Sequence, residues 1–243
     1  MRKRADTLLV ERGFFASRAR AQAAIEAGLV TADGIAVVKA SQAIEESAPI
    51  QAAEAHPYVS RGGVKLAAAL DAFSLDPSGL ACLDIGASTG GFTDALLKRG
   101  AKGVVAVDVG TAQLAQSLRA DARVTVLENT DARALTRAAA GSPQAITFDV
   151  SFISLTKIFP PVLALAAHGA WLVALVKPQF EAGRAALVKG RVRDPAALAA
   201  ARTGVRTAAE ALGWATIGEM DSPILGGDGA REFLYAARHA GNI

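Results

Sequence analysis

Cysteine is almost absent from this sequence, which has a single one, Cys82, among 243 residues. One cysteine excludes a disulfide framework and a zinc site built on several thiolates within the chain. A lone cysteine inside an apolar segment usually fills a hydrophobic core. This usage suits a reducing compartment, and we expect a cytoplasmic protein.

Long apolar runs are also missing. The most apolar window, 158–176, is interrupted at four positions, and its pattern indicates a helix followed by a buried strand. The interrupting residues are Pro160, Pro161, His168 and Gly169. The first 15 residues are basic but lack the apolar segment of a signal peptide. The sequence therefore predicts no stable membrane insertion.

Neither sign of charge is in large excess. The formal net charge is +3, which weakly favours a polyanionic partner. The chain is 51% hydrophobic and long enough for one full domain and a small second one. We predict a small module at 1–47, a polar and alanine-rich linker at 48–59, and the main domain at 60–243.

The small module is predicted to contain two helices and a hairpin. Helices are expected over 7–12 and 18–27, with Ser17 as the N-cap of the second. Asp33 and Gly34 lie between two β-prone runs, which is typical of a hairpin turn. This order of elements resembles the small RNA-binding domain named after ribosomal protein S-four, although that domain usually has asparagine where Asp33 stands.

Basic side chains are concentrated at the start of the module. In the first 20 residues, only Asp6 and Glu11 oppose six lysine and arginine residues. Arg4, Arg18 and Arg20 are the candidates for RNA phosphate contacts, since guanidinium groups bind phosphates through two hydrogen bonds. The alternative is a solvated basic surface on an accessory domain.

The main domain is organised around the segment 80–94, LACLDIGASTGGFTD. It predicts a buried strand over 80–85, a glycine-rich turn and the start of a helix, a combination that forms a nucleotide-sized cradle. The spacing fits neither the dinucleotide fingerprint nor the phosphate loop. The candidate cofactor residues here are Asp84, Gly86, Ser88, Thr89, Gly90 and Gly91. The alternative is a tight turn with no ligand.

Two further acidic residues follow predicted strands. Asp108 ends a strand in 103–110, where a carboxylate can accept hydrogen bonds from ribose hydroxyls. Asp131 follows a strand over 124–127 and could accept from an adenine amino group or cap the next helix, two roles between which the sequence does not choose. The glycine-rich turn and Asp108 together resemble the S-adenosylmethionine site of Rossmann-like methyltransferases.

Charged residues also follow the next two predicted strands. Asp149 ends a strand over 145–150, and Lys177 ends a fully apolar strand over 170–176. Lys65 lies near a helix start, where the helix dipole disfavours a cation, and Glu232 opens the last strand. Because ligands bind at the carboxyl ends of strands in open α/β sheets, these residues are expected at one edge. A solvated lysine is the alternative for Lys65.

A second basic segment precedes the helix expected at 195–212. Lys189, Arg191 and Arg193 lie in this loop, and Arg61 lies in the segment before the first helix of the main domain. We expect these four residues to contact RNA. A surface loop with no partner is the alternative.

Taken in order, Lys65, Asp149, Lys177 and Glu232 resemble the catalytic tetrad of the FtsJ-like 2′-O-ribose methyltransferases. The motifs SRGGVKL, DIGASTGGFTD, DVSFIS, VKPQFE and SPILGGDGAREF, behind the S-four-like module, resemble the TlyA/hemolysin A family over nearly the whole chain. The chain departs from the family at Arg191, where a second glycine is common, and at Ala230, where asparagine is common.

The resemblance implies an α/β protein: a Rossmann-like methyltransferase sheet with a small N-terminal α+β RNA-binding domain. It implies S-adenosylmethionine as cofactor, ribosomal RNA or ribosomal subunits as partner, cytidine 2′-O-methylation as activity, and no metal. Lys177 would orient and deprotonate the hydroxyl, and Lys65 would stabilise the developing alkoxide. Asp149 and Glu232 would hold the two amines.

Three alternative functions stay open at this point. A methyltransferase could act on a small molecule or a protein, although the four tetrad residues and the basic N-terminal module argue against it. A ribosome-assembly factor could bind RNA and S-adenosylmethionine without turnover, although an intact tetrad argues against it. A membrane-active hemolysin would agree with one name of the family. The missing signal peptide, membrane span and cationic amphipathic helix argue against that function.

Overall fold

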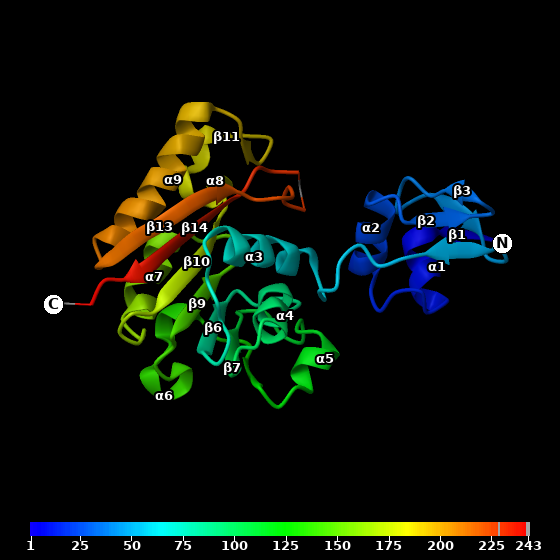
Figure 1. The fold of residues 1–243 in the computed structure, drawn as a ribbon. Coiled ribbons are helices and arrows are strands. Elements are labelled where there is room, and N and C mark those ends of the chain that lie inside the picture. Colours follow the sequence, from blue (N-terminus) through cyan, green and yellow to red (C-terminus); the bar gives the residue numbers. More distant parts are fainter. Residues whose placement is uncertain (228, 242–243) are drawn as a thin grey trace. The chain divides into compact units, whose positions relative to one another are not determined.

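A computed structural model describes residues 1–227 and 229–241 of the chain. The described residues divide into two compact units, of which the first covers 1–61 and the second begins at residue 62. Figure 1 shows the elements of each unit. None of the described helices is long and apolar enough to cross a membrane.

The first unit packs two helices against short antiparallel strands. Strands β1 and β4 pair with each other, and β3, β2 and β5 form a second small sheet. The elements are β1 (Arg2–Arg4), α1 (Ala5–Glu11), α2 (Arg18–Glu26), β2 (Val30–Ala32), β3 (Ile35–Ala36), β4 (Ala43–Glu45) and β5 (Ile50–Ala52). Ser17 caps α2 by accepting from the N–H of Arg20, as predicted. Strand β5 lies within the segment 48–59 that was expected to be a linker. It belongs to the first unit, because it pairs with β2.

The hairpin of the first unit is also formed as predicted. Asp33 and Gly34 connect β2 to β3 with φ angles of 53° and 74°. Two successive residues at positive φ match the twist of an antiparallel pair, which explains the Asp-Gly sequence.

The second unit is built on a seven-stranded sheet in the order β13-β14-β10-β9-β6-β7-β8. The five strands from β10 to β8 are parallel, and β14 runs antiparallel to both of its neighbours. The strands are β6 (Ala81–Ile85), β7 (Gly103–Val107), β8 (Val124–Leu127), β9 (Ala145–Phe148), β10 (Trp171–Val176), β13 (Trp214–Asp221) and β14 (Phe233–His239). The chain order reverses between β6 and β9, so a ligand site is expected where these strands end.

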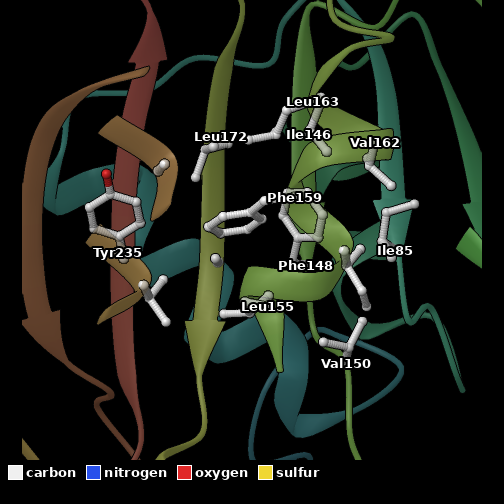
Figure 2. Close-up of a cluster of buried hydrophobic side chains, with 14 of the residues drawn as sticks. Ile85, Ile146, Phe148, Val150, Leu155, Phe159, Val162, Leu163, Leu172 and Tyr235 are labelled. Carbon is white, nitrogen blue, oxygen red and sulfur yellow. The ribbon is translucent and has the colours of Figure 1, made fainter. Parts of the chain in front are cut away.

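Helices cover both faces of this sheet (Figure 1). On one face, α7 (Leu155–Leu163) and α9 (Pro195–Glu210) pack on strand residues in a continuous core. Figure 2 shows this core, where the rings of Phe148 and Phe159 lie with centroids 5.1 Å apart. Helices α3 (Arg61–Ala72) and α4 (Gly91–Lys98) bury apolar side chains outside that cluster, on the opposite face.

The sequence that follows the second predicted strand of the main domain, 111–119, predicts a helix, and this helix is shorter in the structure. Only Gln116–Arg119 of the segment 111–119 is helical, as α5. The Glu128 carboxylate accepts from the backbone N–H groups of Ala112, Gln113 and Leu114 instead, at 2.9 to 3.3 Å. These three hydrogen bonds lower the pKa of Glu128 to about 2, together with Arg119 and against the effect of desolvation. Ala112 has φ 55°, which is outside the right-handed helical region, and the Glu128 carboxylate holds this non-helical segment as a fixed loop.

The remaining elements are short. They are η1 (Ala132–Ala134), α6 (Arg137–Ala140), α8 (Pro178–Glu181), η2 (Arg184–Ala186), β11 (Leu187–Val188) and β12 (Arg191–Val192). Strands β11 and β12 form a hairpin in the basic loop that was expected before α9.

Candidate active site

A cavity of about 510 Å³ opens where β6, β7 and β9 end. This volume is ordinary for a small-molecule site. Its walls come from four loops and are mostly apolar, with carboxylates at intervals. The lining residues include Gly86, Ser88, Asp108, Val109, Gln113, Asp131, Arg133, Asp149, Phe152 and Ile158. The cavity therefore lies at the reversal point between β6 and β9.

The glycine-rich turn brings the end of β6 against the loop after β9. Gly86 has φ +82°, and a Cβ on it would lie 2.6 Å from the backbone oxygen of Asp149. Gly90 has φ +96° and is the N-cap of α4. Of the six residues predicted in this stretch, Gly86 and Ser88 line the cavity, whereas Asp84, Thr89, Gly90 and Gly91 do not. Glycine at 86 is needed for the close approach of the two loops.

Asp108 lies at the end of β7, as predicted, and lines the cavity. Its oxygens accept from the backbone N–H groups of Ser88 at 2.8 Å and Gly110 at 2.7 Å. A carboxylate has about four lone-pair positions, so two remain for further donors. This residue therefore joins the glycine-rich turn to β7 and keeps capacity for the hydroxyls of a ribose.

Asp84 is fully buried beneath the cavity. Its two oxygens accept from the hydroxyls of Thr93 at 2.7 Å and Thr147 at 2.8 Å. Desolvation raises the pKa of Asp84 to about 6, the two hydroxyls oppose this rise, and the charge of Asp149 adds to it. Asp84 therefore ties β6 to α4 and β9 and has no side-chain oxygen at the cavity wall.

Asp131 caps the helical turn η1. Its carboxylate accepts from the backbone N–H of Arg133 at 2.9 Å and pairs with the Arg133 guanidinium at 2.6 Å. The hydrogen bonds from Arg133 lower the pKa of Asp131 to about 2. The capping role, one of the two left open by the sequence, is present. Since Asp131 also lines the cavity, an adenine contact stays a prediction.

The four tetrad residues form two ion pairs. The Lys177 amine lies 2.7 Å from Asp149 Oδ1 and donates to Ser151 Oγ at 2.8 Å. The amine of Lys65 donates to the Glu232 carboxylate, and both side chains are buried. A buried lysine with a buried carboxylate partner excludes the solvated-lysine alternative for Lys65.

Strand register brings the two ion pairs to the same edge. Val176 of β10 pairs with Phe233 of β14, and these strands are antiparallel. Continuing the register by one residue places Lys177 opposite Glu232. Residues directly opposite in an antiparallel pair have Cβ atoms about 5 Å apart. The register of the sheet therefore places Lys177 beside Glu232, the carboxylate that pairs with Lys65.

Sequence reasoning missed three side chains around Lys177. Ser151 accepts from its amine, and Phe152, at φ 67°, is 91% exposed beside the cavity. Glu181, one turn after Lys177, accepts from Ser154 Oγ at 2.6 Å and from the backbone N–H of Leu155 at 2.9 Å. Burial raises the pKa of Glu181 against these hydrogen bonds. The only signal was their place in the motifs DVSFIS and VKPQFE.

Arg4 and Arg18 of the first unit are brought together by a buried carboxylate. Asp6 accepts from Arg4 at 3.0 Å, from Arg18 at 2.7 Å and from Gln22 at 2.9 Å. Burial opposes ionisation of Asp6, but these hydrogen bonds outweigh it and hold its pKa well below the usual range. Both guanidinium groups stay about half exposed. The sequence identified the arginines but not their shared anchor.

The other candidate RNA contacts are spread over several elements. Arg20 pairs with Glu54 at 3.0 Å, and Arg61 pairs with Glu26 at 3.5 Å. Lys189 lies at the turn of the β11–β12 hairpin with φ 50° and is exposed, as is Arg193. Arg191 lies beside Gly229, where a Cβ would be 3.3 Å from its Nη2.

Comparisons with known proteins extend over nearly the whole chain. A family model described as FtsJ-like methyltransferase matches residues 58–239. The 16S/23S rRNA (cytidine-2′-O)-methyltransferase TlyA of Mycobacterium tuberculosis is 44% identical over 241 residues, which cover 98% of this chain and 90% of that protein.

Solved structures agree with these matches. A putative hemolysin from Streptococcus thermophilus has a TM-score of 0.79 and 40% identity, covering 99% of this chain and 90% of the other. The N-methyltransferase NodS from Bradyrhizobium japonicum, at 14% identity and a TM-score of 0.52, covers 73% of this chain and 96% of its own, and it shows the fold alone. The predicted Rossmann-like methyltransferase fold is confirmed.

Proposed function

Because this chain belongs to the FtsJ-like methyltransferase family, we propose that it transfers a methyl group from S-adenosylmethionine to the ribose 2′-hydroxyl of a cytidine in ribosomal RNA. The observation that carries the proposal is the pair of lysine–carboxylate contacts, Lys177 with Asp149 and Lys65 with Glu232, at the edge of the sheet. The Mycobacterium tuberculosis relative, a 16S/23S rRNA (cytidine-2′-O)-methyltransferase, supports the choice of a cytidine and of ribosomal RNA.

The cavity fits the cofactor. When bound, S-adenosylmethionine supplies an electrophilic methyl group on a sulfonium. Asp108 would hold the ribose hydroxyls, and Asp131 would face the adenine edge, with Gly86 and Ser88 lining the turn between them. The apolar wall around Ile158 suits a ring system. Asp84, Thr89, Gly90 and Gly91 would act indirectly, by shaping the turn.

The proposed chemistry begins with a weakly acidic hydroxyl. Lys177, in its uncharged form, accepts the proton of the 2′-hydroxyl as the oxygen attacks the methyl group. Lys65 places a positive charge near the developing alkoxide, which lowers the barrier in a site shielded from water. Asp149 and Glu232 hold the two amines by charge-assisted hydrogen bonds.

The two units would divide the work. The methyltransferase segment, 60–243, carries the cavity and the tetrad, whereas 1–47 would bind RNA through the exposed guanidinium groups of Arg4 and Arg18. Arg20 and Arg61, with Lys189, Arg191 and Arg193 of the basic loop, are further candidate contacts. Such contacts to phosphates weaken as salt rises.

The decisive experiment is transfer of a tritiated methyl group to ribosomal RNA, ribosomal subunits and whole ribosomes. Lys177→Met removes the amine at nearly constant volume and should reduce transfer by about 10² to 10⁴-fold. Lys102→Met, an exposed lysine at the opposite ends of the strands, is the matched control and should keep full activity. Binding of S-adenosylmethionine, measured by dialysis, should be unchanged in both.

The outcomes separate the alternatives. Label at one nucleotide that resists alkaline cleavage, and that is lost in Lys177→Met, would establish ribose methylation and identify the target. Equal labelling by both variants would rule out Lys177 as the base. No label on any RNA with cofactor still bound would favour an assembly factor. Leakage from liposomes at micromolar protein would favour membrane activity.

A further inference from the structure

Two oxygen atoms from one loop hold the Lys177 amine. Asp149 Oδ1 lies 2.7 Å from Nζ and Ser151 Oγ lies 2.8 Å from it. Both residues belong to the loop that joins β9 to α7, and Lys177 follows the neighbouring parallel strand β10. The amine therefore bridges adjacent strand ends through two separate acceptors.

These two contacts fix the direction in which the lone pair of the uncharged Lys177 amine points. An ammonium group has three hydrogens, and two of them are committed to Asp149 and Ser151. When the group is uncharged, it has two hydrogens and one lone pair. If both hydrogens stay on the same acceptors, the lone pair occupies the third position and cannot turn. With Asp149 alone, the amine could rotate about the Cε–Nζ bond, and its lone pair would sample several directions.

We infer that Ser151 is a positioning residue, which holds the Lys177 amine so that its remaining position faces the ribose hydroxyl. This inference rests on the proposed function and extends it to a side chain outside the tetrad. Ser151 accepts a hydrogen bond from Lys177 and takes no proton from the substrate. Correct orientation of a reacting group is a large part of enzymatic rate enhancement.

The loop that carries Ser151 is fastened at its far end. Glu181 of α8 accepts from Ser154 Oγ at 2.6 Å and from the Leu155 N–H at 2.9 Å. Ser154 is also the N-cap of α7. The segment 149–155 is thus bound to 177–181 at both ends, by Lys177 at one and Glu181 at the other. A hydroxyl on so short and doubly fastened a loop can define the direction of the amine.

Other charged groups near Lys177 come from the neighbouring elements. Asp149 lies on the β9 side, Glu232 is placed opposite Lys177 by the β10–β14 register, and Lys65 of α3 is bound to Glu232. Ser151 is the uncharged partner in this group. Its removal changes the hydrogen bonding of the amine without changing the number of charges.

The test compares Ser151→Ala with Ser151→Thr in single-turnover methyl transfer from tritiated S-adenosylmethionine to the ribosomal particle that the wild type labels. Ser151→Ala should lower the plateau rate about tenfold, because the lone pair is no longer held. Ser151→Thr, which keeps the hydroxyl, should stay within about threefold of the wild type. Ser142→Ala, at the opposite end of β9, is the control and should keep the full rate.

A pH profile separates orientation from damage to the loop. Loss of an acceptor destabilises the ammonium more than the amine, so the half-maximal rate of Ser151→Ala should move to lower pH by roughly half to one unit. A lower plateau rate in Ser151→Ala, together with a rate that rises at lower pH than in the wild type, supports the role of Ser151 in positioning the Lys177 amine. A rate within twofold of the wild type, an unmoved profile, or failure of threonine to restore the rate would overturn the inference.

The two proposals fail separately. If the wild type transfers no label, or if Lys177→Met transfers as much as the wild type, the proposed function itself is wrong. If the wild type is active, Lys177→Met is inactive and Ser151→Ala is unaffected, only the role of Ser151 is wrong. Cofactor binding by dialysis should be the same in all variants.

Discussion

Asp6 in the first unit and Asp84 in the second are both fully buried, yet their ionisation is displaced in opposite directions. Asp6 accepts hydrogen bonds from two arginines, and its pKa lies well below the usual range despite the desolvation that opposes this. Asp84 accepts from two threonine hydroxyls, and desolvation raises its pKa to about 6. Neither side chain is exposed to solvent, but Asp84 lies deeper in its unit than Asp6, which lies beneath two half-exposed arginines, and the hydrogen-bond donors also differ.

The difference shows what each carboxylate can do. An ionised carboxylate with two guanidinium partners is stable out of water and can organise a basic surface. A carboxylate whose donors are all uncharged is held less firmly in its charged form. Asp6 therefore acts as an anchor for Arg4 and Arg18, whereas Asp84 ties three elements beneath the cavity at some cost in stability near neutral pH.

Removing the charge of Asp6 should give the largest effect. Asp6→Asn leaves two arginines without their shared anion, and we expect the first unit to lose about 3 to 4 kcal/mol at pH 7, the lower part of the range for broken buried pairs because the arginines are half exposed. Hydrogen exchange of amides in 1–61 measures this loss. The folded pKa of Asp6 is lowered, so the effect is complete above about pH 4 and fades as pH falls further.

The control for this variant lies on the surface of the same unit. Glu45→Gln removes an exposed partner of Arg2, and such pairs contribute about 0 to 1 kcal/mol. Equal losses in Asp6→Asn and Glu45→Gln would show that burial of the Asp6 carboxylate has no special role. Lower RNA affinity in Asp6→Asn would further support Arg4 and Arg18 as phosphate contacts.

Asp84→Asn should act in the opposite sense. The folded pKa of Asp84 is about 6 against an ordinary value of 3.8. Unfolding therefore releases a proton between these two values, and the wild type loses about 2.4 kcal/mol as pH rises from 4 to 7. Relative to the wild type, Asp84→Asn should become more stable by about that amount over the same range.

Denaturant unfolding followed by tryptophan fluorescence measures this difference, because both tryptophans, Trp171 and Trp214, are buried in the second unit. The two variants together test the comparison, since one loses stability at neutral pH and the other gains it. A stability difference between Asp84→Asn and the wild type that is flat from pH 4 to 7 would contradict the raised pKa.

The smallest expected effect comes from the hydroxyls around Asp84. Thr93→Val keeps the shape of the side chain but removes the donor 2.7 Å from the carboxylate. We expect a loss of about 1.5 to 3 kcal/mol at pH 8, where Asp84 is ionised, and a smaller loss at pH 5. Unfolding curves at both pH values measure the difference. An equal loss at both would mean that Thr93 acts through packing alone.

The framework of the second unit could be predicted from sequence because its parallel strands are short, mostly apolar runs. The parallel strand Trp171–Val176, for example, is preceded by Gly169 and followed by Lys177 and Pro178, which mark its limits in the sequence. The segment 111–119 was misjudged since Ala112 has a left-handed backbone conformation, with φ 55°, and the Glu128 carboxylate holds the loop around it. A side chain 14 to 16 residues away leaves no periodic signal, and local patterns cannot report it.

The candidate site was predictable to a similar degree. Strand ends gave Asp108, Asp149 and Lys177, because their positions follow from topology. The family resemblance predicted that Asp149 and Glu232 hold the two lysines, and the structure shows which carboxylate contacts which lysine. Ser151 looked like an ordinary loop residue, since its contact with Lys177 depends on how two strand ends are aligned.

Strand β14 has a consequence for the order in which the protein is made. It lies between β10 and β13, so β10 has an unpaired edge until β14 has been synthesised. Phe233, which pairs with Val176, follows it by 57 residues in the sequence. At 5 to 20 residues per second, synthesis of that interval takes roughly 3 to 11 s. Glu232 arrives with the same segment. Before this segment is made, the nascent chain has a complete first unit and a sheet in which β10 is unpaired on one side. Synthesis of 232–239 then adds the fourth tetrad residue and the partner strand of β10 in one late step.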